Sequence, residues 1–380
     1  MTHRLLFLDH APFLGGAETV LLDIVRTLDR ARFEPIVGTP AHSALVAPAE
    51  ALGVRVIPSD LPQLNTRSPL ALIPALKSVR QLRATLQREH IDLIHTNTVR
   101  AHLIGTLAAL GTSIPVVWHL HDDTFPRALL NRLINRPRRL IAISRYVAEF
   151  YDVTQDPRCT VIYNGVEINR TIEHNAAFRQ RWNIPETGPL IVNIGRLARW
   201  KGQDVFIQAA AQLTQHYPDA CFAIVGGYDP DDHGTSELSG GPAYFSELQA
   251  LCAALHLTDR LIFTSHVGDM AAVYASADVV VHTSKRPEPF GRVLIEAMAA
   301  SLPVVATNTG GPAEIVVDGE TGLLVPAADS AALAQALALL TDDAPRCHQF
   351  GQAARHRVEG VFALKTQVEK LDAVYTSILS

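Results

Sequence analysis

Short apolar runs bounded by turn residues alternate with helical stretches along the whole chain. Continuous apolar runs of this kind are typical of buried strands in parallel sheets that helices cover on both faces. The first half has predicted strands at 4–9, 34–39, 55–58, 91–96, 116–120, 139–143 and 160–163. The second half has them at 190–194, 221–225, 261–264, 277–282, 303–306 and 322–325. The pattern therefore predicts an α/β fold, twice over.

The 380 residues are enough for two domains with a full core each. The stretch between Ile168 and Pro189 has no strand pattern and ends in turn formers, so it reads as the linker. We therefore expect a first Rossmann-like domain over 1–170 and a second over 171–360.

The apolar runs are all too short to cross a membrane. Residues 5–8 form a brief run with a charge at each end and no cleavage site, which predicts a strand and not a signal peptide. The Ala- and Leu-rich stretch 331–340 is interrupted by Gln335, so it predicts a helix of a globular core. These patterns lead us to expect a cytoplasmic protein.

Charge divides unevenly along the chain. Residues 1–170 hold 19 Lys and Arg and 15 Asp and Glu, a net charge of +4, while the remainder has a net charge of −9. Two segments with Leu and Ile at helical spacing carry the basic residues, and each fits either an anionic membrane surface or a solvated helix face. The basic residues are Lys77, Arg80, Arg83 and Arg88 in one segment and Arg127, Arg132, Arg136, Arg138 and Arg139 in the other.

Cysteine spacing argues against a disulfide frame and against a zinc site. The cysteines stand far apart, which fits reduced and buried thiols without a function. They are Cys159, Cys221, Cys252 and Cys347.

The stretch 286–316 carries the most informative polar residues. Glu288 precedes a Pro-Phe-Gly run that suits the start of a helix, and Glu296 falls inside that helix. Predicted strands flank the unit, and ligands of such units bind at the carboxyl ends of the strands. A helix N-terminus favours phosphate there, and carboxylates accept hydrogen bonds from sugar hydroxyls. The combination indicates a nucleotide sugar.

Two glycine-containing loops support a phosphate ligand. Gly15 and Gly16 open a helix after the first strand, which fits either a phosphate-binding turn or an ordinary tight turn. Arg196 and Lys201 frame the loop after strand 190–194, and two fixed cations there suit a diphosphate.

His119 and His121 end the strand 116–120 and point to one face. Paired histidines raise the question of a metal site, but no further ligand has suitable spacing, so we expect no metal there. A histidine in such a place more often forms a structural hydrogen bond.

Taken together, these motifs resemble retaining glycosyltransferases of family 4, which have the GT-B fold. The resemblance rests on EPFG, on Glu288 and Glu296 with seven residues between them, on Gly310-Gly311-x-x-Glu314, and on the G-R-L-x(3)-K-G run that starts at Gly195. It covers essentially the whole chain. It also implies that the first domain, 1–170, binds the acceptor and that the second, 171–360, binds the nucleotide-sugar donor, with the helix 361–380 packing back on the first domain. Ser301 departs from the family's usual Gly.

The resemblance assigns a role to each matching residue. His121 would contact a hydroxyl of the transferred sugar, and the Gly15-Gly16 loop would face the donor phosphates. Glu288 would orient the donor sugar and Glu296 would bind the ribose hydroxyls. The diphosphate would be held by Arg196, Lys201 and the amides near Phe290 and Gly291. The base would be held through the backbone of His266 and Val267.

We therefore expect transfer of a sugar from a UDP- or GDP-sugar, with retained configuration and no cofactor or divalent metal. The expected partners are this donor and a glycan, lipid-linked or small-molecule acceptor, with a peripheral anionic membrane surface as an option and no nucleic acid. Rival interpretations are a two-domain sugar-binding protein and another GT-B enzyme, such as an epimerase or a phosphorylase. The loop 228–242, rich in Asp and Gly, receives no role.

Overall fold

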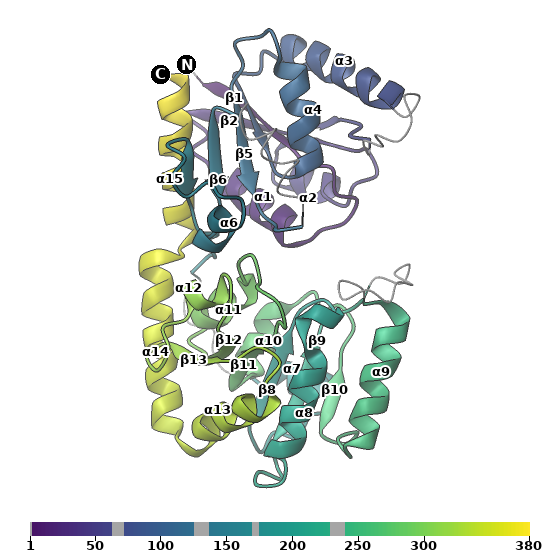
Figure 1. The fold of residues 1–380 in the computed structure, drawn as a ribbon, viewed down its shortest axis with the longest axis vertical. Coiled ribbons are helices and arrows are strands. Elements are labelled where there is room, and N and C mark those ends of the chain that lie inside the picture. Colours follow the sequence, from purple (N-terminus) through teal and green to yellow (C-terminus); the bar gives the residue numbers. More distant parts are fainter. Residues whose placement is uncertain (1, 63–71, 125–136, 169–174, 229–239) are drawn as a thin grey trace. The chain divides into compact units, whose positions relative to one another are not determined.

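The computed structural model describes residues 2–62, 72–124, 137–168, 175–228 and 240–380 (Figure 1). The chain divides into two compact units, one formed by Met1–Gly165 with Leu364–Ser380 and the other by Val166–Ala363. Each unit contains one parallel sheet with helices packed on it, so the predicted α/β class is confirmed for both halves.

The sheet of unit 1 has seven strands in the order β3-β2-β1-β4-β5-β6-β7, and all neighbouring pairs are parallel. The strands are β1 (His3–Leu8), β2 (Phe33–Thr39), β3 (Arg55–Pro58), β4 (Leu93–Thr96), β5 (Val116–Leu120), β6 (Arg139–Ala142) and β7 (Cys159–Val161).

Helices cover both faces of this sheet because successive side chains of a strand point to opposite sides. Leu5 and Phe7 of β1 face a core that α1 and α15 cover, whereas Leu6 and Leu8 face a core under α3 and α4. The described helices of unit 1 are α1 (Gly16–Thr27), α2 (Val46–Ala51), α3 (Leu72–Arg88), α4 (Val99–Ala109), α6 (Arg145–Phe150) and the C-terminal α15 (Leu364–Leu379).

The sheet of unit 2 has six parallel strands in the order β10-β9-β8-β11-β12-β13. They are β8 (Leu190–Ile194), β9 (Cys221–Val225), β10 (Leu261–Phe263), β11 (Val279–His282), β12 (Val304–Thr307) and β13 (Gly322–Val325).

The main core of unit 2 lies between this sheet and α8, α9 and α13, where Phe206, Phe222 and Leu337 are buried. The described helices of the unit are α7 (Ala177–Arg181), the 3₁₀ turn η2 (Arg199–Lys201), α8 (Gln203–Leu213), α9 (Gly241–Ala254), α10 (Met270–Ser276), α11 (Arg292–Ala299), α12 (Pro312–Ile315), α13 (Ser330–Asp342) and α14 (Ala344–Val361).

Every strand predicted from the apolar runs is present, and no strand end differs from its prediction by more than two residues. The strand predicted to begin at Ile91 begins at Leu93, because Ile91 still belongs to the turn that closes α3 and bonds back to the carbonyl of Leu86. Within the described ranges, no helix is long and apolar enough to cross a membrane.

In both sheets the strand order reverses direction next to the first strand of the unit, between β1 and β4 and between β8 and β11. At such a switch point the loops at the carboxyl ends of the two strands diverge and leave a crevice in which ligands of α/β proteins bind. These two places are therefore the first to search for a site.

Candidate active site

The switch point of unit 2 brings Lys201 and Glu288 together. Lys201 lies in η2 after β8, and Glu288 lies in the loop that joins β11 to α11. The Lys201 Nζ atom is 2.6 Å from Oε2 of Glu288, and the two side chains are only 20% and 14% exposed. Residues 87 positions apart in sequence thus form a mostly buried ion pair at the carboxyl ends of neighbouring strands.

Glu288 has further partners at the same oxygen. Oε2 accepts a hydrogen bond from the Ser284 hydroxyl at 3.0 Å and lies 3.3 Å from Nε2 of His282. Burial alone would raise the pKa of this carboxyl, but the Lys201 ammonium and the His282 contact outweigh it and hold the pKa well below the usual range. Glu288 is therefore a fixed negative charge at neutral pH.

Backbone packing places Lys201. Gly202 follows it with φ of 69°, and a Cβ at this position would collide with the backbone carbonyl of Thr283. The Thr283 hydroxyl donates to the carbonyl of Lys201 at 2.9 Å. The ammonium also lies 4.2 Å from the ring centroid of Trp200, with which it forms a cation–π contact. The Lys-Gly step of the motif thus docks the loop after β8 onto the end of β11.

Glu296 lies in α11, as predicted, and Glu288 in the loop before it. The two carboxylates have separate partners. The Tyr274 hydroxyl donates to Oε2 of Glu296 at 2.9 Å, and Arg292, one turn earlier, donates to Oε1 at 3.2 Å. Burial, with Glu296 beside it, raises the pKa of Tyr274 well above its usual value, so its hydroxyl stays protonated and donates.

Glycines let two loops of this site pack backbone against backbone. Gly310 has φ of 67° and pairs with Glu288 in an isolated parallel bridge, while the amide of Gly311 donates to the Glu288 carbonyl at 2.8 Å. A Cβ at Gly310 would strike the backbone of Glu288, and one at Gly311 the backbone of Phe290. Gly291 is the N-cap of α11 with φ of 105°, so the N–H groups at the start of the helix follow directly after Phe290.

Arg196 and His266 are exposed after β8 and β10. The Arg196 guanidinium makes no ion pair or hydrogen bond with other residues that the structure describes, although its carbonyl accepts one from Gln203 at 3.0 Å. Val267 is half-buried. Unlike Lys201, Arg196 is thus available to a ligand without giving up a partner in the described part of the chain.

In unit 1 the Gly15-Gly16 loop begins α1, with Gly15 at the N-cap in an extended conformation. Glu18 reaches back and accepts a hydrogen bond from the Gly15 amide at 2.8 Å. Glu18 is buried near Asp9, which follows β1 and accepts from the Asn97 amide group at 2.7 Å. Burial, with Asp9 second, raises the pKa of Glu18 to about 7.

His119 and His121 lie side by side, with ring centroids 4.0 Å apart. His119 is buried, and its Nδ1 is 3.2 Å from Nε2 of His95, whose Nδ1 is 2.8 Å from the Tyr375 hydroxyl of α15. Burial, with His121 as the next cause, lowers the pKa of His95 to about 3 and that of His119 well below its usual value. These neutral rings link the C-terminal helix to the sheet, whereas His121 is half-buried at its edge.

The described residues contain no group of three or more His, Cys, Asp or Glu that could hold a metal ion. Cys221 and Cys252 are buried, Cys159 and Cys347 are partly buried, and all four are free thiols. Among the described residues, neither a metal-ligand group nor a cysteine therefore gives a candidate site beyond the two switch points.

Comparison with known proteins agrees with this geometry. The family model "Glycosyl transferases group 1" matches residues 175–357, and "Glycosyltransferase Family 4" matches residues 14–170. A lipopolysaccharide core biosynthesis mannosyltransferase, LpcC, from Rhizobium leguminosarum bv. viciae is 31% identical over 86% of this chain and 89% of its own. The chain belongs to the GT-B glycosyltransferases of family 4.

Two further family members have informative names. A D-inositol 3-phosphate glycosyltransferase from Salinispora arenicola (strain CNS-205) is 30% identical over 90% of this chain and 82% of its own. The crystal structure of Anabaena Alr3699/HepE in complex with UDP and glucose superposes with a TM-score of 0.82 at 28% identity, covering 98% of this chain and 99% of the other.

Within this glycosyltransferase, the structure sorts the residues that the motifs singled out into two groups. In unit 2, Lys201 directly contacts Glu288, and the backbone that carries Phe290 and Gly291 packs on the Gly310-Gly311 loop. The Gly15-Gly16 loop and His121 belong to unit 1 and follow β1 and β5. The loop 228–242 lies mostly outside the described residues, which resume at Gly240.

Motif reading missed His282, Ser284, Trp200 and Tyr274, which contact the predicted residues. A signal existed for His282 and Ser284, because polar residues that end an apolar strand lie at the edge where ligands bind. Tyr274 had no such signal, since its contact with Glu296 depends on how α10 packs near α11.

Proposed function

We propose that this glycosyltransferase moves a sugar from a nucleoside-diphosphate sugar to an acceptor with retention of anomeric configuration. The observation that carries the proposal is the mostly buried ion pair of Lys201 and Glu288 at the switch point of unit 2. A cation fixed there attracts the diphosphate, and a carboxylate fixed beside it accepts hydrogen bonds from sugar hydroxyls. A ligand that needs both is a sugar joined to a diphosphate.

The other predicted residues complete this proposal. Arg196 is a second cation for the diphosphate, and the N–H groups at the start of α11 face the same negative charge. Glu296 binds the ribose, and the backbone of His266 and Val267 holds the base. UDP and glucose bound to Anabaena HepE support a uridine donor.

Catalysis in this scheme depends on charge placed in advance. Negative charge grows on the diphosphate as the glycosidic bond breaks, and Arg196 and Lys201 stabilise it in the transition state. Glu288 stabilises the positive charge that develops on the sugar, and His121 contacts a sugar hydroxyl. The departing phosphate takes the proton of the acceptor hydroxyl, which attacks from the same face and thereby retains the configuration.

No cofactor enters this scheme, and we propose that the two cations perform the task that a divalent metal performs in other transferases. The acceptor is a glycan, a lipid-linked sugar or a small polyol. Relatives named for lipopolysaccharide core synthesis and for D-inositol 3-phosphate support these classes.

A donor panel tests the proposal. The protein is incubated with UDP-glucose, UDP-galactose, UDP-N-acetylglucosamine and GDP-mannose, with and without EDTA, and free UDP or GDP is measured. We expect slow release from one donor, unchanged by EDTA. Binding of a donor without release in the presence of acceptors would instead identify a sugar-binding protein, and conversion of the donor to an isomer would identify an epimerase.

A further inference from the structure

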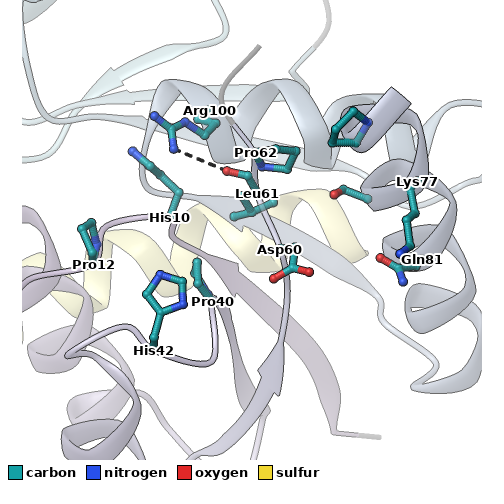
Figure 2. A pocket seen from close by; sticks show the side chains of 12 residues that line it. His10, Pro12, Pro40, His42, Asp60, Leu61, Pro62, Lys77, Gln81 and Arg100 are labelled. Atoms are coloured by element: carbon teal, nitrogen blue, oxygen red, sulfur yellow. Dashed lines mark hydrogen bonds between the residues drawn. The ribbon is translucent and has the colours of Figure 1, made fainter. Parts of the chain in front are cut away.

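Two groups of polar side chains adjoin the switch point of unit 1. One lines a pocket of about 470 Å³, where Lys77 is among the lining residues and the Arg100 guanidinium reaches the Leu61 carbonyl at 3.5 Å (Figure 2). Residues that follow β1 and β4 line this pocket, so it belongs to the switch point already described. The other group is a row of rings on the face of the sheet that α15 covers, and it runs from Tyr375 to His121.

The row begins at Tyr375, whose ring packs edge-on against Phe7 and Phe33 with centroids 6.5 and 5.9 Å away. Tyr375 is fully buried, and among the described residues His95 is the only hydrogen-bond partner of its hydroxyl, with Nδ1 at 2.8 Å. Burial, with Asp372 as the second cause, raises the pKa of Tyr375 well above its usual value, so the hydroxyl keeps its proton. The row therefore starts with a buried donor.

Proton positions along the row follow from the number of hydrogen bonds that each arrangement satisfies. If the Tyr375 hydroxyl donates to Nδ1 of His95, then Nε2 of His95 carries the ring proton and donates to Nδ1 of His119 at 3.2 Å. Only the N–H at Nε2 of His119 is then left without a partner among the described residues. The reverse direction leaves two buried groups without a partner there, the Tyr375 O–H and the bare Nε2 of His119. Since each unsatisfied buried group costs free energy, the first arrangement is the more stable one.

The far end of the row is His121 at the edge of the sheet. Its ring lies at 46° to the ring of His119, with 4.0 Å between the centroids. Burial lowers the pKa values of His95 and His119, so both rings stay neutral at neutral pH and each holds a single proton. His119 is fully buried and cannot turn without losing its hydrogen bond from His95, so the ring against which His121 packs is fixed.

We propose that Tyr375 is a positioning residue of the transferase. Through His95 it holds His119 in one tautomer and one orientation, and His119 in turn holds the His121 ring at the edge of the sheet. The place of His121 at the transferred sugar rests on the proposed function. The row itself does not, because it is present in the protein without a donor, where its proton positions can be measured.

Tyr375→Phe tests the row, because it removes the hydroxyl and keeps the ring and its packing. NMR spectra of the full chain, with histidine labelled at its ring nitrogens, give the tautomer of each imidazole. In the wild type we expect the ring proton on Nε2 of both His95 and His119. In the variant, Nδ1 of His95 loses its donor and the preference for one tautomer weakens, so the ring signals of His95, His119 and His121 should all move.

Gln367→Met is the matched control, because Gln367 is also a buried polar residue of α15, about two turns before Tyr375. Its described hydrogen bonds go to Gly165 at 2.7 Å and to Asn164 at 3.5 Å. The control should lower the melting temperature, as Tyr375→Phe does, and leave the histidine signals unchanged. The same signal changes in both variants would show that the histidines only report how α15 packs, and would overturn the proposal.

Activity gives a second readout. With the best donor, Tyr375→Phe should lower kcat roughly threefold to tenfold, the effect of one neutral hydrogen bond, and leave the affinity for UDP unchanged. The amide of His95→Gln can still donate to Nδ1 of His119, whereas His95→Leu has no donor, so the Gln variant should keep more of the wild-type kcat. If Tyr375→Phe leaves the signals of His119 and His121 as in the wild type, or if His95→Leu is as active as His95→Gln, the positioning role is overturned.

The spectra and the kinetics also separate a failure of this inference from a failure of the proposed function. The expected tautomers and signal changes without turnover of any donor by the wild type would contradict the proposed function and keep the row. Turnover of a donor with an unchanged kcat in Tyr375→Phe would contradict the positioning role and keep the transferase.

Discussion

Two largely buried glutamates, Glu18 in unit 1 and Glu288 in unit 2, have opposite electrostatic surroundings. Glu18 lies near Asp9, and burial together with that carboxylate raises its pKa to about 7. Glu288 is mostly buried too, with 14% of its side chain exposed, but the Lys201 ammonium at 2.6 Å and His282 hold its pKa well below the usual range. Glu18 accepts a hydrogen bond in the first turn of α1 and Glu288 accepts one in the loop before α11, so the neighbouring charge decides the difference between their pKa values.

The comparison shows that the two switch points are built for ligands in different ways. In unit 2 Lys201 is already paired with Glu288, so the diphosphate that we propose as its ligand would share this cation with Glu288. In unit 1 the cations Arg100 and Lys77 have no carboxylate partner among the described residues, and a ligand gains their charge at no cost in broken pairs. Substitutions of Lys201 and of Glu288 should therefore have coupled effects on stability and on ligand binding.

The largest expected effect is on the stability of the protein when the ion pair of Lys201 and Glu288 is broken. Lys201→Met should lower the free energy of unfolding by about 3 kcal/mol, because it leaves the mostly buried Glu288 carboxylate without its Lys partner. Adding Glu288→Gln should restore much of that loss. Denaturant unfolding of the two single variants and the double variant measures the coupling, and strictly additive changes would show that the pair is not an energetic unit.

A matched control is Lys285→Met. Its ammonium is also 2.6 Å from a carboxylate, that of Asp204, but the side chains are 34% and 28% exposed. Solvent screens such a pair, and its loss should cost no more than about 1 kcal/mol.

The next effect concerns the pH dependence that Glu18 imposes. Burial and Asp9 raise the pKa of Glu18 from 4.5 to about 7 in the folded protein. Between these two values the folded protein keeps the proton and the unfolded chain loses it, so the free energy of unfolding falls as pH rises from about 4.5 to about 7. Glu18→Gln cannot ionise and can still accept from the Gly15 amide. Between pH 5 and pH 8 the variant should gain on the order of 2 kcal/mol over the wild type in free energy of unfolding. If the free energy of unfolding changes with pH in the same way for the variant and the wild type, the raised pKa of Glu18 is wrong.

A smaller effect is expected for Glu296. Glu296→Ala should weaken binding of UDP and of UDP-glucose alike, by about tenfold, since the ribose is common to both. Tyr274→Phe removes only the hydroxyl that donates to Glu296 and should weaken both ligands less. Calorimetric titration of both variants with UDP and with UDP-glucose measures these affinities. A Glu296→Ala variant with weaker affinity for UDP-glucose alone would place Glu296 at the sugar instead.

The smallest effect concerns an anionic membrane surface. On α3, Arg83 donates to three carbonyls at the end of α4 and Arg88 bonds to Glu89, so neither is free to contact lipid as the charge pattern suggested. Arg80 and Lys77 remain, beside the exposed Ile73 and Leu76. Arg127, Arg132 and Arg136 of the second basic segment lie outside the described residues.

Arg80→Ala should therefore lower recovery with anionic liposomes in a flotation assay, by an amount worth about 1 kcal/mol, and salt should weaken binding of the wild type. The same recovery with neutral liposomes would show that charge does not direct the binding.

The alternation of apolar runs was sufficient to predict both sheets, because buried parallel strands are apolar along their whole length and turn residues mark their ends. The ends themselves depend on tertiary contacts. Ile91 is apolar like the strand that follows, yet its amide bonds back to Leu86 and leaves the first ladder position to Leu93.

The motifs placed Lys201 and Glu288 in one site, but they did not predict that the two side chains contact each other. Glycine motifs identify Gly202 and Gly310 because only glycine fits the backbone approaches found there. The contact between Lys201 and Glu288 spans 87 residues and depends on which strands are neighbours, which periodicity does not reveal. Motif reading therefore assigned separate ligands to two side chains that bind each other.

The most direct test of the account is a comparison of Glu288→Gln with the wild type in two measurements, UDP affinity and kcat with the best donor. Glutamine keeps the size of the side chain but releases Lys201 from its ion pair, so UDP should bind as tightly as before or a few-fold more tightly. The rate should nevertheless fall, by roughly a hundredfold, because the charge that stabilises the sugar in the transition state is gone. A Glu288→Gln enzyme with full kcat, or one that loses UDP affinity, would contradict the role that the structure and the proposal give to this pair.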